Sequence, residues 1–383
     1  MKIVSVVGAR PNFMKIAPFI RAIEAYNENA EEPIEHLLVH TGQHYDDRMS
    51  KVFFETLDIP EADIHLGVGS GTHAEQVGQT MIAFEKVVRE VRPDWVVVVG
   101  DVNATLACAV TAKKEGVKLC HIEAGLRSGD MSMPEEINRL VTDRLSDLLL
   151  TPDRFADENL QREGVDKTRI VFVGNIMIDT LEAHREQAAA LDTKAVVTEN
   201  VLDTHQAEAY DPSAPFSVVT LHRPSNVDEK AVLEEIVDFL SDEVANEEQL
   251  LWPVHPRTRG KLESFGLWGK LAAHPRIALL HPLHYHAMLH LNMHAHMIFT
   301  DSGGLQEESC VLGTPCLTFR WNTERPVTLA RYGGASILVG NSVEKIREAY
   351  ASIKDAPRKP TRPERWDGKT AERCVRAIVD YKG

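Results

Sequence analysis

Short apolar segments alternate with helical patterns along nearly the whole chain of 383 residues, and this alternation restricts the fold more than any other feature. Runs such as 95–100 and 117–122 lack polar alternation, which is typical of strands that are buried on both faces of a sheet. Helical patterns follow them, for instance at 104–115 and 135–146. We therefore expect an α/β fold in which parallel sheets carry helices on both faces.

The alternation occurs twice, which indicates two Rossmann-like, doubly wound domains that face a cleft. The N-terminal domain is expected at 1–182 and the C-terminal domain at 183–365, with a last helix in 366–383 packing back onto the first domain. A polar stretch at 192–215 has no clear period and is predicted to be a linker region. Strands are expected at 3–8, 36–41, 95–100, 117–122, 148–151 and 170–173, and then at 216–220, 250–254, 277–280, 297–300, 315–319 and 336–339.

Charge and cysteine spacing restrict the class of protein. The formal net charge of −15 argues against a nucleic-acid partner, because proteins that bind nucleic acids concentrate positive charge. The five cysteines form no CxxC pair, as expected for reduced thiols in a cytosolic protein. The first apolar run is too short for a signal peptide, and no apolar stretch reaches the length that spans a membrane. We expect a cytoplasmic protein with no membrane partner.

Acidic residues lie where predicted strands end in the first half. Glu123 closes an apolar run, and Glu135 falls in the first turn of the next predicted helix, where the helix dipole favours an anion. Two carboxylates in different surroundings could form an acid/base pair, but a helix start beside a salt-bridged loop fits the pattern equally well. Asp101 follows another apolar run and, taken alone, is predicted to cap the next helix.

Basic residues and glycines mark the corresponding positions in the second half. His222 and Arg223 end its first predicted strand, and His255 ends the next, which together favour a wall that faces an anion. The Ser-Gly-Gly motif at 302–304 follows a further strand, and a helix begins at once, so that free backbone amides could bind phosphate. An ordinary tight turn between a strand and a helix is the alternative.

A histidine-rich run at 281–296 is the one pattern that suggests a metal. His286, His290 and His294 share a helical face, but no carboxylate or cysteine within the run completes a ligand set. We interpret it as a helix packed against its neighbour. The chain also has no P-loop and no convincing dinucleotide fingerprint, so we expect neither a metal nor a cofactor.

Taken together, the motifs resemble those of the non-hydrolysing UDP-N-acetylglucosamine 2-epimerases. The matching segments are GARPNFMK (8–15), VVGDVNATLA (98–107), HIEAGLRSGDMSMPEEINR (121–139), LHRPSN (221–226), PVHPR (253–257) and DSGGLQEES (301–309). The resemblance implies the two-Rossmann fold of GT-B glycosyltransferases and reversible interconversion of UDP-GlcNAc and UDP-ManNAc without a redox cofactor. UDP would leave C1 while a base removes the C2 proton, giving 2-acetamidoglucal, and UDP would then add back.

The resemblance also implies roles for particular residues. Asp101, Glu123 and Glu135 would be the acid/base carboxylates, with the one that removes the C2 proton left open, and His222 would stabilise the leaving UDP. It further implies a UDP-sugar substrate, a homodimer, and a supply of ManNAc-type sugars for surface polysaccharide. The implied substrate-binding residues are Arg10, Lys15, Ser302, Gly303, Gly304, Glu308 and Arg325.

Some members of the family have a second UDP-GlcNAc site that activates the enzyme. This sequence departs from their Gln-His-Arg pattern, because Tyr45 follows His44. The positions that match the second site are Gln43, His44, Glu136, Arg223 and His255.

Three alternatives to this reading remain open on the sequence alone. The substrate could be a modified UDP-HexNAc of the diacetamido uronic acid type. A GT-B glycosyltransferase would share the phosphate motif, but it would need an acceptor cleft and only one base. A nucleotide-sugar sensor without catalysis would not need three acidic positions in the first half.

Overall fold

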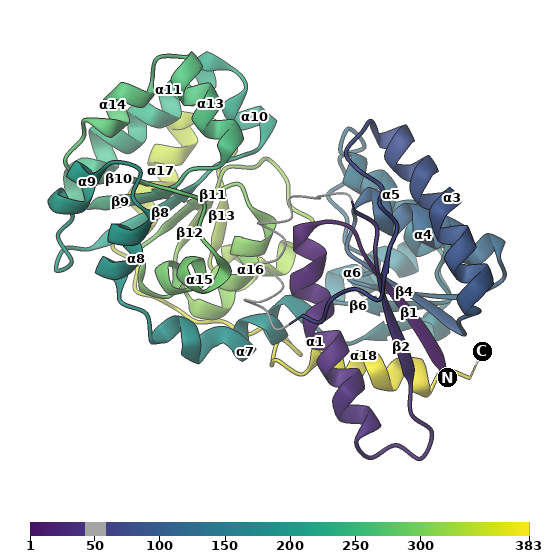
Figure 1. Ribbon diagram of the computed structural model, residues 1–383. Helices are drawn as coiled ribbons and strands as arrows, with labels where there is room; N and C mark the ends of the chain where they lie inside the picture. Colours follow the sequence, from purple (N-terminus) through teal and green to yellow (C-terminus); the bar gives the residue numbers. More distant parts are fainter. Residues whose placement is uncertain (43–58, 383) are drawn as a thin grey trace. The chain divides into compact units, whose positions relative to one another are not determined.

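The computed structural model describes residues 1–42 and 59–382. Contacts within the chain divide it into two compact units: unit 1 comprises Met1–Ala183 and Pro363–Gly383, and unit 2 comprises His184–Arg362. Each unit is built around one parallel sheet with helices packed on it (Figure 1), so the predicted α/β class is confirmed. Within the described ranges, no helix is long and apolar enough to cross a membrane.

Unit 1 has a seven-stranded sheet in the order β3-β2-β1-β4-β5-β6-β7. The chain adds β2 and β3 on one side of β1 and then returns to place β4 on the other side. Open α/β sheets bind ligands at the carboxyl ends of the strands beside such a reversal. The strands are β1 (Lys2–Val7), β2 (Glu35–His40), β3 (Ile64–His65), β4 (Trp95–Val99), β5 (Lys118–Ile122), β6 (Leu148–Thr151) and β7 (Ile170–Phe172).

Helices on unit 1 bury the apolar strands. Every residue of β4 is buried, and Phe84 of α3 and Cys108 of α4 pack with this strand in one cluster. The helices that begin in unit 1 are α1 (Arg10–Asn27), α3 (His73–Val91), α4 (Asn103–Lys114), α5 (Pro134–Leu145), α6 (Arg154–Arg162), α7 (Ile176–Ala189) and α18 (Thr370–Val379).

Unit 2 repeats this strand arrangement with a six-stranded sheet in the order β10-β9-β8-β11-β12-β13. Its first strand, β8, again lies at the reversal. The strands are β8 (Phe216–Thr220), β9 (Gln249–Pro253), β10 (Ile277–Leu280), β11 (Ile298–Thr300), β12 (Cys316–Thr318) and β13 (Ser336–Leu338). The helices are α8 (Thr193–Asn200), α9 (Thr204–Ala209), α10 (Pro224–Val227), α11 (Lys230–Phe239), α12 (Ala245–Glu247), α13 (Pro256–Ser264), α14 (Trp268–Ala272), α15 (Tyr285–His294), α16 (Gly303–Leu312) and α17 (Val343–Ile353).

The linker predicted at 192–215 is wrong. Helices α8 and α9 occupy most of this stretch, and the aspartates that precede them, Asp192 and Asp203, cap their first turns. Val196 and Val197 are buried in a core cluster of unit 2. Helices of six to eight residues are too short to show a clear 3.6-residue period, so the sequence pattern resembled a polar loop.

The last segment of the chain returns to unit 1, where α18 packs against α1 (Figure 1). Asp179 of α7 accepts hydrogen bonds from the backbone amides of Thr370 (3.1 Å) and Ala371 (2.7 Å), which caps the start of α18. The indole of Trp366 is buried and donates to the carbonyl of Pro152 (3.0 Å). These contacts make residues 363–382 part of the first unit.

Gly174 lies just after β7, where the returning segment passes close to the backbone. Its φ is +98°, and a Cβ added there would lie 2.1 Å from the carbonyl oxygen of Arg365. Gly164 has a similar φ of +79° but open space around the Cβ position. Substitution of Gly164 therefore tests backbone strain alone, whereas substitution of Gly174 adds steric overlap with Arg365.

We expect Gly164→Ala to lower the free energy of unfolding by roughly 1 kcal/mol, because it adds only the strain of positive φ. Gly174→Ala should cost about 1–3 kcal/mol more, since the returning segment must move. Differential scanning fluorimetry of both variants measures the difference. Equal losses of Tm would show that the close approach of Arg365 does not restrict residue 174.

Candidate active site

Glu123 lies directly after β5 in a backbone conformation that L-residues rarely adopt. Its φ is +70°, and its side chain is buried and ion-paired with Lys15 of α1. Gly100, at the end of the neighbouring strand β4, allows this pair to approach. A Cβ on Gly100 would lie 3.2 Å from Lys15 Nζ and 3.5 Å from Glu123 Oε2. A non-glycine residue held at positive φ indicates local strain, which is common at functional sites.

His121 and Asp143 together fix the backbone before and after Glu123. His121 Nε2 lies 2.8 Å from the carbonyl oxygen of Gly100, and His121 Nδ1 lies 2.6 Å from Asp143 Oδ1. The other oxygen of Asp143 accepts from the amide of Gly125 (2.9 Å) and from Arg127 (2.7 Å). Burial opposes ionisation of Asp143, but its hydrogen bonds and electrostatic interactions with His121 and Arg127 hold its pKa below the usual range. Both ring nitrogens of the fully buried His121 lie within hydrogen-bond distance of an oxygen.

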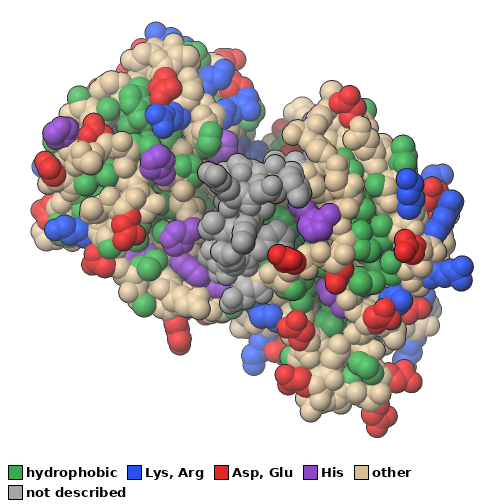
Figure 2. All heavy atoms as spheres, in the orientation of Figure 1, with side chains coloured by type: hydrophobic (Ala, Val, Ile, Leu, Met, Phe, Trp, Pro, Cys, Tyr) green, Lys and Arg blue, Asp and Glu red, His purple; other side chains and the backbone are tan. Residues whose placement is uncertain are grey.

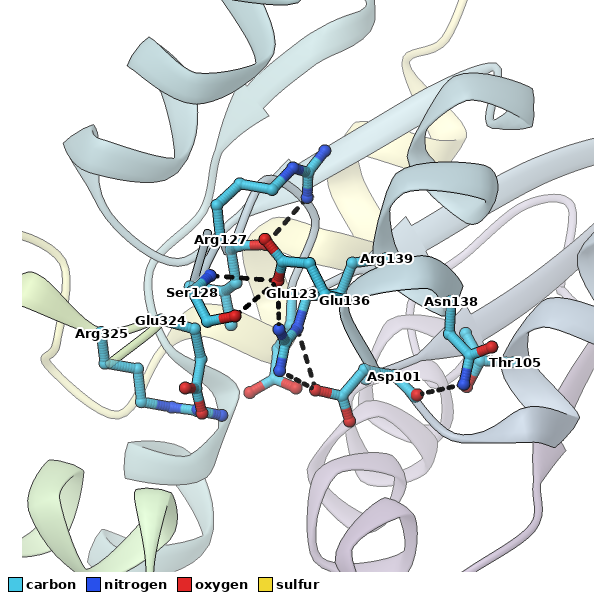
Figure 3. A network of polar contacts seen from close by, with 12 residues as sticks. Asp101, Thr105, Glu123, Arg127, Ser128, Glu136, Asn138, Arg139, Glu324 and Arg325 are labelled. Carbon is cyan, nitrogen blue, oxygen red and sulfur yellow. Dashed lines mark hydrogen bonds and ion pairs between the residues drawn. The ribbon is translucent and has the colours of Figure 1, made fainter. Parts of the chain in front are cut away.

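Asp101 follows β4 and pairs with an arginine on α5 (Figure 3). Arg139 donates to Asp101 Oδ2 from Nε (3.0 Å) and from Nη2 (2.6 Å). The prediction that Asp101 caps the next helix is wrong, because the N-cap of α4 is Val102. Instead, Asn138 of α5 donates to the Asp101 carbonyl (2.8 Å), so both groups of Asp101 face α5.

Glu136 uses its carboxylate to organise the loop before α5 (Figure 3). It accepts from the amides of Ser128 (3.0 Å) and Gly129 (2.9 Å), and Arg139 Nη1 donates to it at 2.6 Å. Burial raises the pKa of Glu136, but these hydrogen bonds outweigh burial and lower it. Arg139 thus connects the loop to Asp101.

Glu135 differs from its neighbour. It is half-buried in the first turn of α5, and its side chain makes no hydrogen bond or ion pair with any residue in the described part of the chain. Arg10 opens α1, but its side chain is outside the described atoms, and Gln43 and His44 lie outside the described residues. The structure therefore brings Lys15, Glu123 and Asp101 to the carboxyl edge of β4 and β5, with Glu135 on the helix that follows.

In unit 2, the corresponding edge is organised by Asp301, which is buried at the end of β11. Its carboxylate accepts from His222 Nδ1 (2.7 Å), from the amide of Arg223 (2.9 Å) and from Asn226 Nδ2 (3.0 Å). Burial raises the pKa of Asp301, but these donors hold it below its usual value. The imidazole of His222 is 42% exposed, and its Nε2 is directed away from the carboxylate. The ring of His255 lies near it, with the ring centroids 5.7 Å apart.

Helix α16 begins beside this carboxylate. Ser302 is its N-cap and makes no side-chain cap, and the two glycines at 303–304 form its first turn. A Cβ on Gly303 would lie 3.0 Å from Arg325 Nη1, whereas Gly304 has open space at that position. Amides in the first turn of a helix have no partner within the helix and attract anions. The geometry fits a phosphate group at 302–304.

Arg325 is buried between two carboxylates. Its Nε donates to Glu307 Oε1 at 2.6 Å, and its Nη1 contacts Glu324. Glu324 also accepts from Arg320 at 2.6 Å. Two acidic neighbours neutralise much of the guanidinium charge, so Arg325 positions the start of α16 at least as much as it supplies positive charge.

Glu308 is buried one turn further along α16. Burial raises its pKa to about 7, the nearby polar groups of Tyr285 and Asn292 act in the opposite direction, and the charge of Glu307 raises it further. The carboxyl group is thus near its midpoint at neutral pH and can donate or accept a hydrogen bond.

The histidine-rich run contributes structural contacts in unit 2. His290 bonds to the carbonyl of Ala188 (2.9 Å) and to Thr193 (2.8 Å), and His286 bonds to His184 (2.9 Å). Histidine side chains also reach the surface of unit 2 on the face shown in Figure 2. Among the described residues, no group of three His, Cys, Asp or Glu side chains could hold a metal ion.

Sequence reasoning missed most partners of the predicted residues. Asp143, Arg139 and Asp301 are ordinary helix or strand-end residues by pattern. Arg139 and Asp301 carried a signal, since they lie in the matching segments 121–139 and 301–309, but nothing in the sequence indicated that they contact Asp101 and His222.

A model of the family described as UDP-N-acetylglucosamine 2-epimerase matches residues 27–379. The UDP-N-acetylglucosamine 2-epimerase of Methanocaldococcus jannaschii is 40% identical over 99% of both chains. The crystal structure of that archaeal protein with UDP-GlcNAc and UDP superposes with a TM-score of 0.86 over 99% of both chains, at 40% identity. The UDP-2,3-diacetamido-2,3-dideoxy-D-glucuronate 2-epimerase of Pseudomonas aeruginosa is 38% identical over 91% of both chains.

The raised pKa of Glu308 predicts a pH-dependent stability. The folded-state pKa of about 7 exceeds the unfolded value of 4.5, so the protonated form contributes stability that is fully present below pH 4.5 and is lost as pH rises through 7. Glu308→Gln keeps the shape and removes the titration. Its Tm relative to wild type should therefore increase from pH 5 to pH 8, by the equivalent of roughly 2–3 kcal/mol.

The exposed glutamate of α17, Glu348, provides the matched control. The Tm of Glu348→Gln relative to wild type should stay constant over the same range. A flat difference for Glu308→Gln as well would show that Glu308 is ionised in the folded protein.

Proposed function

Because this chain belongs to the UDP-N-acetylglucosamine 2-epimerase family, we propose that it interconverts UDP-GlcNAc and UDP-ManNAc. The chain is an isomerase of that family. The observation that carries the proposal is identity of 40% over 99% of both chains with an enzyme of this name. The buried Lys15–Glu123 pair and the exposed His222 beside the start of α16 support it.

In the proposed reaction, a carboxylate of unit 1 removes the C2 proton. The C–H electron pair forms the C1–C2 double bond, and the C1–O bond breaks with its electrons leaving on UDP. The product pair is 2-acetamidoglucal and UDP, and the reverse addition gives the other C2 configuration. Because protons are returned and no electrons are lost, the chemistry balances without a redox cofactor. We assign the proton transfers to Asp101, Glu123 and Glu135.

The diphosphate is proposed to bind in unit 2, with His222 Nε2 and the first-turn amides of α16 as its donors. Positive groups aimed at a leaving anion stabilise the charge that develops on it. Glu308 would contact the ribose, and the remaining binding roles fall to Arg10, Lys15, Ser302 and Arg325.

A second candidate substrate is a UDP-2,3-diacetamido uronic acid. The 38% identity to the Pseudomonas aeruginosa enzyme favours it specifically. Parallel assays with UDP-GlcNAc and with the diacetamido substrate decide between them by the ratio of kcat/KM.

We also propose that the protein is a cytoplasmic homodimer that supplies ManNAc-type sugars for surface polysaccharide. Its five cysteines are free and buried, which suits a reducing compartment, and cell fractionation tests the location. Ile82 on α3 is 64% exposed and Ile137 on α5 is 46% exposed. Helices α3 and α5 both pack against α4, on one side of the sheet (Figure 1). Exposed aliphatic side chains of this kind favour an interface between copies.

Sedimentation velocity should give twice the chain mass for the wild-type protein. Ile82→Asp and Ile137→Asp place charges on the proposed interface and should shift the protein towards the monomer. Exposed Val379 on α18 offers a control, and Val379→Asp should leave the mass unchanged. A monomeric wild-type protein would refute the homodimer.

Proton NMR with UDP-GlcNAc in D2O tests the reaction, since C2 exchange and the appearance of UDP-ManNAc are both visible. Glu123→Gln and Glu135→Gln should each reduce the rate of C2 exchange by roughly 10²- to 10⁴-fold, because a general acid or base is lost. UDP affinity should change little in these variants. His222→Ala should instead weaken UDP binding.

Glu90→Gln, at the exposed end of α3, is the matched control and should exchange at the wild-type rate. Near wild-type rates in both Glu123→Gln and Glu135→Gln would overturn the assignment of this edge as the catalytic centre. The same assay at rising substrate concentration tests the second site proposed for Gln43, His44, Glu136, Arg223 and His255, which predicts a sigmoidal rate.

A further inference from the structure

A cavity of ≈ 780 Å³ lies in unit 1 between the edge strand β7 and the C-terminal segment of the chain. Arg169 lines its end beside the start of β7, and Arg365 lines the other end. Arg373 and Arg376 enter from α18, one helical turn apart. The sheet order places β7 two strands away from β5, so the cavity is separate from the carboxyl edge that holds Glu123.

The position of β7 at the edge of the sheet explains why arginines gather there. An edge strand has backbone carbonyls with no neighbouring strand to bind them. Arg365 donates to the carbonyl of Phe172, and Arg373 Nε donates to the carbonyl of Val173 at 2.6 Å. Arg169 donates to the carbonyl of Ser146. Neutral carbonyl acceptors hold these guanidinium groups in place without adding a negative charge.

Carboxylates neutralise only part of this charge. Arg373 pairs with Asp367 (2.6 Å). Arg169, Arg365 and Arg376 make no ion pair within 4 Å of a carboxylate in the described chain, although Asp166 and Asp157 interact electrostatically with Arg169 and Arg365 at longer range. The acidic residue of the cavity wall, Asp380, is exposed. In a chain with 57 acidic and 42 basic residues, a cavity wall that has four arginines and Lys382 but one acidic residue, Asp380, forms a local excess of positive charge.

The floor of the cavity is partly apolar. Val171 and Phe172 are half-buried, because β7 has a strand on one side only. The guanidinium carbon of Arg365 lies 5.0 Å from the centroid of the Phe172 ring, and Tyr381 closes the cavity at the end of α18. Such a site offers a surface for a ring as well as donors for an anion.

We propose that this cavity binds a small ligand with adjacent phosphate groups, at a site separate from the candidate active site. A guanidinium group presents paired donors that match phosphate oxygens. The three-residue strand separates Arg169 from Arg365 by roughly 10 Å at about 3.3 Å per residue, a distance that several linked phosphates span better than one. Inorganic polyphosphate and a nucleoside triphosphate share this chemistry.

Calorimetric titration with tripolyphosphate tests the site. The affinity should fall as ionic strength rises. Arg376→Gln and Arg365→Gln should each weaken binding roughly tenfold or more, because each removes charged hydrogen-bond donors. Arg144→Gln changes an exposed arginine on α5 of the same unit and should leave the affinity unchanged.

Phenylglyoxal modification, mapped by mass spectrometry, separates this site from phosphate binding in unit 2. Tripolyphosphate should protect Arg169 and Arg376 in the intact protein and leave Arg144 reactive. A parallel titration with ATP distinguishes the sources: tighter binding of ATP that depends on Arg376 assigns a nucleotide, and equal binding assigns the phosphate groups alone. Unchanged affinity in both variants, or no protection of Arg169 and Arg376, would overturn the proposal.

Discussion

The buried ion pair between Lys15 and Glu123 is the interaction on which unit 1's site depends. Two buried charges are stable only when they are paired and when the surrounding backbone is fixed. Two other residues contribute to these conditions. Gly100 has no side chain and leaves room for the pair, and His121 bonds to the carbonyl of this glycine and fixes its backbone. The positive φ of Glu123 is a further cost, which the contacts of Asp143 with residues on both sides of Glu123 offset.

Both units contain a paired carboxylate and histidine, but the two pairs have different roles. In each, a buried carboxylate orients a histidine at the carboxyl edge of the sheet. Asp143 bonds to one ring nitrogen of His121, which is fully buried, and the second nitrogen bonds to a backbone carbonyl. Asp301 holds His222, which is partly exposed. The first histidine therefore serves the architecture, whereas the second presents a nitrogen that can bind a ligand. Exposure, not residue type, separates the two roles.

Charge is organised locally throughout the chain. Although the net charge is −15, acidic and basic side chains intermingle on the face shown in Figure 2. Arginine side chains gather where carboxylates or free backbone carbonyls accept hydrogen bonds from them. Arg139 joins two carboxylates at the loop before α5, and the arginines beside β7 bind the free carbonyls of an edge strand. An anion site can thus arise in an acidic protein without a basic surface.

The sequence by itself determined the fold class, the positions of most strands and the family. Buried parallel strands are continuous apolar runs, so the local pattern placed Asp101, Glu123 and His222 directly after strands, and the family resemblance gave their expected roles. Only the tertiary structure decided how those residues are held. The partners of Glu123 and Asp101 lie 108 and 38 residues away in the chain, and no local pattern encodes such pairs. The short helices at 193–209 were also beyond the sequence, because their stability comes from burying Val196 and Val197 in a core formed by distant strands.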